Sequence, residues 1–338
     1  MKIVAPLSNT DSYEKLVEAG ADEFFCGYVP IQWLEKHTNI VPFNRRESLL
    51  GYHNITEKGS MKILGRMVEK YKVPIKITFN SHYYVRSLYP ILMDVVKDLM
   101  DMGFDTFIIA DIAFIIYLRE KGIDCNIHIS GEMEVYNSNA VKFLNQFDIS
   151  RVVFPRKVTL KNIKDLISNS KLNTMEYEAF ILNAMCLYSG AFCNGIHSDE
   201  LPFICEIPFQ VKRFKGGSNK FRTAEKALNK MVNLQNYSQQ NKQNPQIGQG
   251  NFSYTLASSG CGLCRIKELM DIGVTHLKVV GRGCILETLI KDIQYTNKAI
   301  NIANEPLTSE EYISKIRSEF FNNMCTYLCY YPTGLSKS

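Results

Sequence analysis

Eight short runs rich in branched and aromatic residues recur along the chain, and segments with helical periodicity separate most of them. Leu92, Val96 and Leu99, for example, are spaced four and three residues apart, which places them on one face of a helix. Strands that alternate with helices are typical of a parallel sheet. The runs span residues 3–5, 23–26, 74–79, 106–110, 126–129, 151–154, 178–182 and 276–280.

Eight strands with eight crossovers favour a (β/α)8 barrel of the TIM type over an open doubly wound sheet, which usually has fewer strands. No G-x-G-x-x-G turn, Walker A motif or G-x-S-x-G motif is present. We therefore expect an α/β barrel domain at residues 1–300, with a long cysteine-bearing insertion at 189–260 between the seventh and eighth strands. Residues 301–338 would form a C-terminal helical tail whose helix begins near Thr308 or Ser309.

Composition narrows the class of protein further. The 338 residues are 46% hydrophobic and 22% charged, which describes a soluble globular chain. No apolar stretch is long enough for a membrane span and the first residues do not read as a signal peptide, so we expect a cytoplasmic protein. The net charge of +5 alone does not indicate a polyanionic partner. Basic residues crowd segment 212–230, however, which forms either a solvated face or a contact with RNA or another anion.

Polar residues follow the predicted strands at their C-terminal ends. In a (β/α)8 barrel the loops at these ends converge on one mouth, where the chemistry takes place. The sequence therefore predicts a functional site at the mouth. The residues at these positions are Asn80, Asp111, Ser130, Glu132, Arg156, Asn183 and Arg282.

Two arginines at the mouth are candidate catalytic or binding residues. Arg156 and Arg282 follow the sixth and eighth strands. An arginine can hold a carboxylate or phosphate with two parallel charge-assisted hydrogen bonds. The alternative is that these arginines only cap the strand ends by pairing with Glu132 or Asp111.

Two further candidates lie within strands. Glu178 is inside the seventh strand, and its expected partner is Lys278 on the eighth, because an inward-facing acid needs a partner. This pair is either a structural ion pair or part of a proton relay. His128, in the fifth strand, is either a core histidine with a satisfied ring nitrogen or a catalytic base.

Ten cysteines are many for a reducing compartment, where thiols beyond the ordinary core tend to be catalytic or metal-bound. Four thiolates gathered from loops are what an iron-sulfur cubane or a tetrahedral zinc site requires, and the spacing alone does not choose between them. Buried thiols without a metal are the third interpretation. Cys325 and Cys329, on the expected continuation of the last helix, form either a metal site or a buried stripe. The thiols near the seventh strand and its insertion are Cys186, Cys193, Cys205, Cys261 and Cys264.

Segment 178–193, EAFILNAMCLYSGAFC, resembles the signature of the peptidase U32 family, also called collagenase-like. Residues 19–27 resemble the family's AGAD-x-x-Y-x-G opening, and residues 127–139 its H-x-S-x-Q-x-x-x-x-N stretch. Segments 151–160 and 261–282 resemble two later motifs, so the likeness extends over about residues 1–300. One departure is Val280, which occupies the place of the family's glutamate.

The resemblance implies a barrel-like fold and, as in several family members, an oxygen-sensitive 4Fe-4S cluster. The ligands that it implies by position are Cys186, Cys193, Cys205 and Cys261, with Cys264 as the alternative fourth ligand or a neighbour of the cluster. Zinc remains the alternative metal.

The resemblance also implies two candidate activities, and a third fits the same ligands without an open iron site. Similar iron-sulfur members take part in oxygen-independent hydroxylation of RNA or of a quinone precursor, so we expect an RNA or small-molecule substrate. Other members are named peptidases, which is the second candidate. The third is a cluster-bearing electron-transfer or binding subunit that acts with a related partner chain in a heterodimer.

Overall fold

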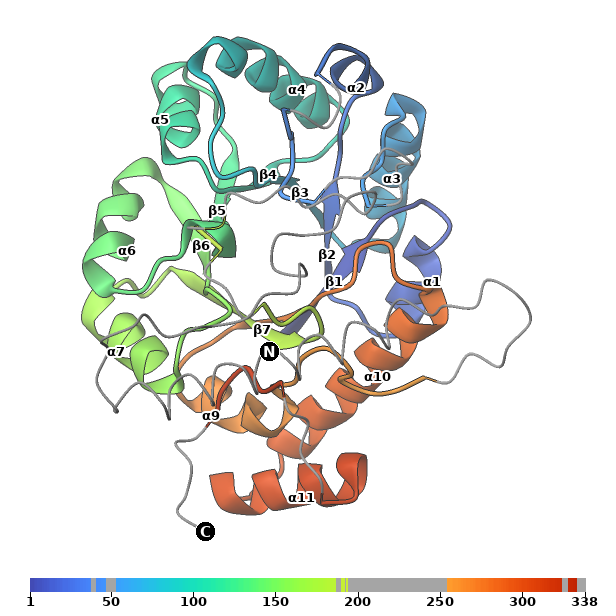
Figure 1. Cartoon of the computed structure of the whole chain (residues 1–338), viewed down its shortest axis with the longest axis vertical. Coiled ribbons are helices and arrows are strands. Elements are labelled where there is room, and N and C mark those ends of the chain that lie inside the picture. Colours follow the sequence, from blue (N-terminus) through green and yellow to red (C-terminus); the bar gives the residue numbers. More distant parts are fainter. Residues whose placement is uncertain are drawn as a thin grey trace, which may run out of the picture. The chain divides into compact units, whose positions relative to one another are not determined.

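The computed structural model describes residues 1–37, 41–46, 53–186, 190–191, 193, 254–323 and 328–332. Almost all of them belong to one compact unit, formed by Met1–Asn194 with Thr255–Ser338. Eight parallel strands in this unit close into a barrel in sequence order, as Figure 1 shows, which confirms the (β/α)8 prediction. The strands are β1 (Lys2–Leu7), β2 (Glu23–Gly27), β3 (Ile75–Phe79), β4 (Thr106–Ile109), β5 (Asn126–Ile129), β6 (Ile149–Val153), β7 (Glu176–Leu182) and β8 (His276–Val279).

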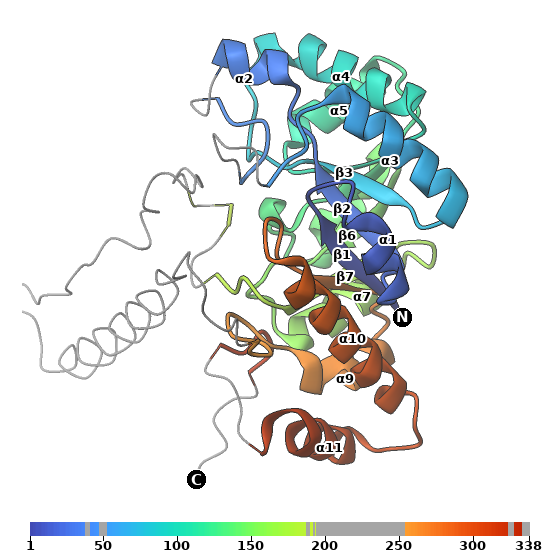
Figure 2. The same ribbon diagram turned by 90° about the vertical axis from the view of Figure 1, so that its right-hand side faces the viewer.

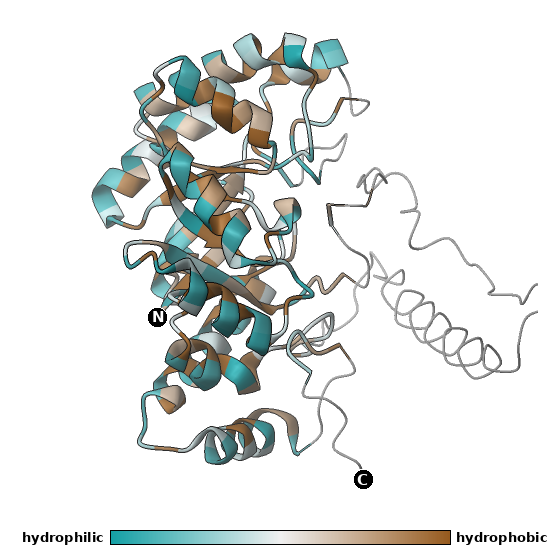
Figure 3. Ribbon diagram, turned by 90° about the vertical axis from the view of Figure 1, so that its left-hand side faces the viewer, coloured by the Kyte–Doolittle hydropathy of each residue, from teal (hydrophilic) through white to brown (hydrophobic). Residues whose placement is uncertain are grey.

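Helices surround the strands, with hydrophilic and hydrophobic residues on different faces (Figure 3). In α4 the residues Leu92, Val96 and Leu99 are all buried, as their spacing predicts. The apolar core therefore lies between the sheet and the helices. The helices are α1 (Tyr13–Glu18), α2 (Ile31–His37), α3 (Lys58–Tyr71), α4 (Tyr89–Asp101), α5 (Ile112–Glu120), α6 (Ser138–Leu144), α7 (Leu160–Ser170), α9 (Ile266–Asp271), α10 (Leu286–Ala303) and α11 (Ser309–Phe321).

A second, small apolar cluster lies inside the barrel. Val4, Phe25 and Ile108 contact one another and are separate from the main core. The separation follows from the strand geometry, since successive side chains point to opposite faces of a sheet. Phe24 accordingly belongs to the main core, whereas its neighbour Phe25 points inward.

Helix α11 lies outside α9 and α10, at the edge of the barrel (Figure 2). It begins as predicted, because Thr308 and Glu311 form a reciprocal capping box. Its buried Tyr312 donates a hydrogen bond to the carbonyl of Leu263 at 2.8 Å, which ties the helix to the segment before β8. None of the helices in the described ranges is long and apolar enough to cross a membrane.

Helix α11 ends before it reaches Cys329, which we expected on the continuation of this helix. Asn322 and Asn323 adopt left-handed backbone angles and terminate α11 after Phe321. Cys329 instead forms a parallel β-bridge with Cys261, so its prediction as part of a helical stripe is wrong. The other member of that stripe, Cys325, lies outside the described residues.

Asp111, one of the polar residues at the mouth, has a structural role. Its Oδ1 caps α5 by accepting hydrogen bonds from the backbone N–H groups of Ala113 and Phe114. Its Oδ2 accepts from the N–H of Tyr84 at 2.8 Å and from the hydroxyl of Tyr89 at 3.1 Å. One carboxylate therefore joins the loop after β3 to the start of two helices.

We expect Asp111→Ala to lower the free energy of unfolding by about 3 kcal/mol, because a helix cap and hydrogen bonds to a charged group are lost together. Urea denaturation measures this change. The exposed Asp124→Ala variant is the control and should stay within about 0.5 kcal/mol of the wild type. A loss below about 1 kcal/mol for Asp111→Ala would contradict this role.

Candidate functional site at the barrel mouth

A buried carboxylate lies at the centre of the mouth. Glu132 follows β5 and is only 9% exposed. Its Oε1 accepts a hydrogen bond from Nη1 of Arg156 at 2.8 Å. Its Oε2 lies 3.7 Å from Nε of Arg45 and 3.5 Å from Nε2 of His82. We call Arg45, His82, Glu132 and Arg156 the Glu132 cluster; it joins the loops that follow β2, β3, β5 and β6.

The Glu132 carboxylate is ionised in this cluster. Burial alone would raise its pKa, but Arg156, His82 and Arg45 outweigh the burial and hold the pKa well below its ordinary value. Two arginines thus contact one buried carboxylate.

Arg156 also contacts the chain that follows β7. Its Nε donates to the carbonyl of Ala184 at 3.2 Å, and its guanidinium lies 4.4 Å from the ring centroid of Phe180. The pairing of Arg156 with Glu132 is the strand-capping alternative that the sequence suggested. Direct binding of an anion by Arg156 stays a prediction.

Arg282 occupies a different part of the mouth. Its Nη1 donates to Oδ1 of Asn54 at 3.1 Å and to Oγ1 of Thr78 at 3.3 Å, rather than to Asp111 or Glu132. Gly27 makes this arrangement possible, since a Cβ at that position would lie 1.8 Å from Oδ1 of Asn54 and 2.4 Å from Nη1 of Arg282.

The first two cysteines of the predicted set lie beside the Glu132 cluster, Cys193 through its main chain. Cys186 is half-buried and close enough to Arg156 to affect it electrostatically. The carbonyl of Cys193 accepts a hydrogen bond from Nη2 of Arg45 at 3.1 Å. A Cβ at Gly190 would lie 2.7 Å from Oε2 of Glu132, so this loop passes directly beside the carboxylate.

The other thiols are on the chain that returns to β8. Cys261 is buried and pairs with Leu182 at the end of β7, in an antiparallel bridge. Cys264 is buried one turn later. Cys205 lies outside the described residues, as does the basic segment 212–230.

The predicted ligands Cys186, Cys193 and Cys261, all in the part of the chain that the structure describes, are not brought together around a single metal ion. Cys186 and Cys261 both lie within electrostatic reach of the Tyr330 hydroxyl, which places the two loops on the same side of the mouth. Soft thiolates are the ligands that iron-sulfur clusters use. Among the described residues, no three His, Cys, Asp or Glu side chains lie close enough to hold a single metal ion.

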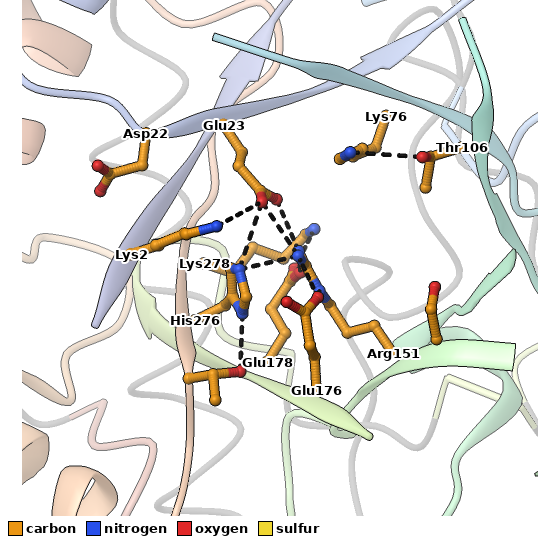
Figure 4. Close-up of polar contacts among 12 residues, drawn as sticks. Lys2, Asp22, Glu23, Lys76, Thr106, Arg151, Glu176, Glu178, His276 and Lys278 are labelled. Carbon is orange, nitrogen blue, oxygen red and sulfur yellow. Dashed lines mark hydrogen bonds and ion pairs between the residues drawn. The ribbon is translucent and has the colours of Figure 1, made fainter. Parts of the chain in front are cut away.

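A network of charges fills the opposite end of the barrel interior (Figure 4). Its centre is Arg151 on β6, which is 2% exposed. Arg151 donates to Glu23 on β2 at 2.8 and 3.1 Å, to Glu176 at 2.7 and 3.0 Å, and to Glu178 at 3.0 Å. Nε2 of His276 is 2.8 Å from the same guanidinium. Glu23, Glu176 and His276 are the first residues of their strands, so the network lies away from the mouth.

Glu178 belongs to this network rather than to the Glu132 cluster. Nζ of Lys278 donates to its Oε1 at 2.6 Å, which confirms the predicted pairing of these two residues. Burial opposes ionisation of Glu178, but Lys278 and Arg151 outweigh it and lower its pKa. The contacts are those of a structural ion pair; a role in proton transfer stays a prediction.

His128 is a buried core histidine on β5. Its Nδ1 has no hydrogen-bond partner among the described residues, so the predicted satisfied nitrogen is not found there. Burial, with Arg151 and Lys76 nearby, lowers the pKa of His128 well below its ordinary value. The imidazole is therefore neutral at pH 7.

Several residues of these groups were not among the candidates chosen from the sequence. Arg151 was considered only as part of a family motif and not as a candidate site residue. Its place within a predicted strand was a usable signal, because a buried arginine needs carboxylate partners and Glu23 also falls within a predicted strand. Arg45 and His82 lie in loops without periodicity, so no local pattern identifies them. Tyr330 lies beyond the last helix, and no pattern in the sequence there indicates contact with the mouth.

The fold and the mouth together define a class: a closed (β/α)8 barrel in which the loops after the strands carry the Glu132 cluster and cysteine-bearing segments. Within that class the chain belongs to peptidase family U32, whose sequence profile matches residues 8–334. The family resemblance seen in the sequence is thereby confirmed.

Curated relatives carry two kinds of name. The chain is 25% identical over 190 residues to the tRNA hydroxylation protein P of Escherichia coli (strain K12), a match that covers 56% of this chain and 38% of that protein. It is 22% identical over 201 residues to a collagenase of Porphyromonas gingivalis, which covers 57% of this chain and 44% of that protein. The chain thus spans less than half the length of these relatives.

Among solved structures, the U32 peptidase Mk0906 is similar over 57% of this chain and 73% of that chain, with a TM-score of 0.43 and 9% identity.

We expect Arg151→Met to lower the free energy of unfolding by about 3 to 5 kcal/mol, because it leaves buried carboxylates without their partner. Denaturation in urea at pH 7 tests this. Arg119→Met, which removes an arginine that donates only to neutral groups at 2.9 to 3.1 Å and weakly to a thiol, is the matched control and should cost less. Equal losses would contradict the special role of the network.

The network also predicts a pH dependence. The pKa values of Glu23 and Glu178 are lowered from an ordinary value of 4.5, so their contribution to stability is complete above that pH and is lost as the pH falls below it. We expect the urea midpoint to decrease on acidification from pH 5 to pH 3, that is, below about the ordinary carboxyl pKa. The decrease should be shallower in Arg151→Met; a midpoint in the wild type that does not change would exclude the ionised network.

Proposed function

We propose that this chain is an iron-sulfur enzyme that carries out oxygen-independent hydroxylation, or a related redox modification, of RNA or a small substrate. The observation that carries the proposal is the position of the thiol-bearing loops. The main chain of the Cys193 loop contacts Arg45, and Cys186 lies beside Arg156, so both loops meet the Glu132 cluster. The names of the tRNA hydroxylation relatives support the same reaction class.

In this proposal Cys186, Cys193, Cys205 and Cys261 hold a 4Fe-4S cluster, with Cys264 as the alternative fourth ligand. When bound, such a cluster supplies one-electron chemistry or, if one ligand is labile, an iron for a substrate oxygen.

The chain's own residues would bind and orient the substrate. The arginines of the Glu132 cluster and Arg282 are the side chains at the mouth that could form charge-assisted hydrogen bonds with a phosphate or carboxylate. Glu132 remains ionised and keeps Arg45 and Arg156 at fixed positions. An RNA substrate accords with the relatives' names and with the basic residues at 212–230.

Peptidase activity is the second candidate, favoured by relatives named as a protease and a collagenase. In that candidate activity Cys186 is a nucleophile instead of a ligand. An electron-transfer or binding subunit with a related partner chain is the third candidate, and it uses the same ligands without an open iron.

We expect protein purified without oxygen to be brown, to contain about four iron and four sulfide per chain, and to give an EPR signal after reduction. Cys186→Ala should lose most of the iron. Cys125→Ala, which removes a buried thiol adjacent to β5, is the control and should retain it. A colourless wild type holding one zinc would exclude the redox proposal.

Two further outcomes separate the alternatives. Peptide cleavage that persists in Cys193→Ala would favour hydrolysis by a site that does not need the cluster. If the protein forms a stable complex with a related chain and neither chain is active alone, the electron-transfer or binding subunit is favoured.

A further inference from the structure

Two consecutive residues after β7 adopt an unusual backbone conformation. Asn183 and Ala184 have φ angles of +65° and +49°, in the left-handed region that non-glycine residues seldom adopt. Cys186 follows two residues later. Such strain persists only where the surrounding structure holds it, and it clusters at functional sites.

The N–H groups of this turn are held by the chain that returns to β8. The N–H of Asn183 donates to the carbonyl of Gly260 at 2.9 Å, and the N–H of Ala184 donates to Oγ of Ser259 at 3.1 Å. The side chain of Asn183 donates to the buried Asp292 of α10 at 2.7 Å. The turn is thus fixed on one side by the returning chain and on the other by a helix.

The two carbonyls of the turn are held by Tyr330 and Arg156. The hydroxyl of Tyr330 donates to the carbonyl of Asn183, and Nε of Arg156 donates to that of Ala184 at 3.2 Å. Both side chains also pack on Phe180: the Tyr330 ring is stacked at 6.0 Å between centroids with a 13° interplanar angle. The guanidinium of Arg156 lies close enough to the Tyr330 hydroxyl to influence its pKa.

Tyr330 comes from the C-terminal segment, Leu328–Pro332. Two backbone hydrogen bonds hold this segment to Cys261: the N–H of Cys261 donates to Leu328 at 2.9 Å, and the N–H of Tyr330 donates to Cys261 at 2.8 Å. Tyr330 is 2% exposed. Burial raises the pKa of its hydroxyl, which therefore stays protonated and can donate at any physiological pH.

We propose that Tyr330 is a positioning residue for Cys186, and that the C-terminal segment Leu328–Pro332 is a component of the mouth. The hydroxyl of Tyr330 donates a hydrogen bond to the Asn183 carbonyl. This hydrogen bond holds the left-handed turn, and the turn sets the position of the Cys186 thiol. The ligand role of Cys186 rests on the proposed function, but the placement of its thiol does not.

The test measures thiol reactivity in metal-free protein. Tyr330→Phe keeps the ring and removes only the hydroxyl. A neutral maleimide with peptide mass spectrometry should label Cys186 about fivefold faster in this variant, the factor by which losing one ordinary hydrogen bond shifts a local opening equilibrium. Cys284 is exposed and serves as the internal reference, with an unchanged rate.

Tyr177→Phe is the matched control. Tyr177 is a buried tyrosine on β7 whose hydroxyl forms a hydrogen bond of 2.8 Å with Ser170, away from the turn. This variant should label Cys186 at the wild-type rate. An unchanged Cys186 rate in Tyr330→Phe would overturn the inference, as would equal acceleration of Cys284 or of Cys186 in the control.

The loaded protein gives a second measurement. Iron loss to a chelator should be about fivefold faster in Tyr330→Phe than in the wild type, for the same reason. If the wild type holds no iron, the proposed function fails, while faster labelling of Cys186 still supports the positioning role. If Tyr330→Phe loses iron at the wild-type rate and its Cys186 is labelled at the wild-type rate, the positioning role of Tyr330 is overturned, while the proposed function still stands.

Discussion

Closure of the parallel ladder between β1 and β8 is the constraint on which the rest of the structure depends. Lys2 pairs with His276 and Val4 with Lys278, so the first and last strands share one set of hydrogen bonds. A closed ring has no exposed edge, and every strand then delivers its C-terminal loop to the same mouth. Residues that are more than a hundred positions apart, such as Arg45 and Cys193, meet only because the ring is closed.

The barrel interior separates two groups of charges with different consequences. The network around Arg151 lies where strands begin, and the Glu132 cluster lies where they end. Between them, the ring of Phe25 lies 3.9 Å from Nζ of Lys278 and 5.9 Å from the guanidinium of Arg282. In the network, three carboxylates contact Arg151, whereas in the Glu132 cluster one carboxylate contacts two arginines.

Much of the fold could be predicted from the sequence, because strand runs and helical stripes are local patterns. The eight strands, the start of α11 and the buried face of α4 all follow from spacing that a few residues show. The end of α11 could not be predicted, because the left-handed conformation of Asn322 is a choice that asparagine permits but does not require.

The positions of the site residues could be predicted from the sequence, but their hydrogen-bond partners could not. Strand ends identified Glu132, Arg156 and Arg282, yet only the closed barrel shows that Arg156 joins Glu132 whereas Arg282 joins Asn54. Arg45 and Tyr330 reach the mouth from a loop and from the tail, and long-range contacts of this kind leave no periodic trace in a sequence. The thiols were found by spacing, and their ligand role is a separate chemical question.

The segment between β7 and β8 leaves and returns through adjacent positions. The N–H of Met185 donates to the carbonyl of Ser259 at 2.8 Å. This hydrogen bond joins the two ends of the segment that lies between these residues. Because the entropic cost of closing a loop rises only slowly with its length, the stability of the barrel depends little on the length of the segment that this hydrogen bond closes. Insertions or deletions within the enclosed segment should therefore change the stability of the barrel only slightly.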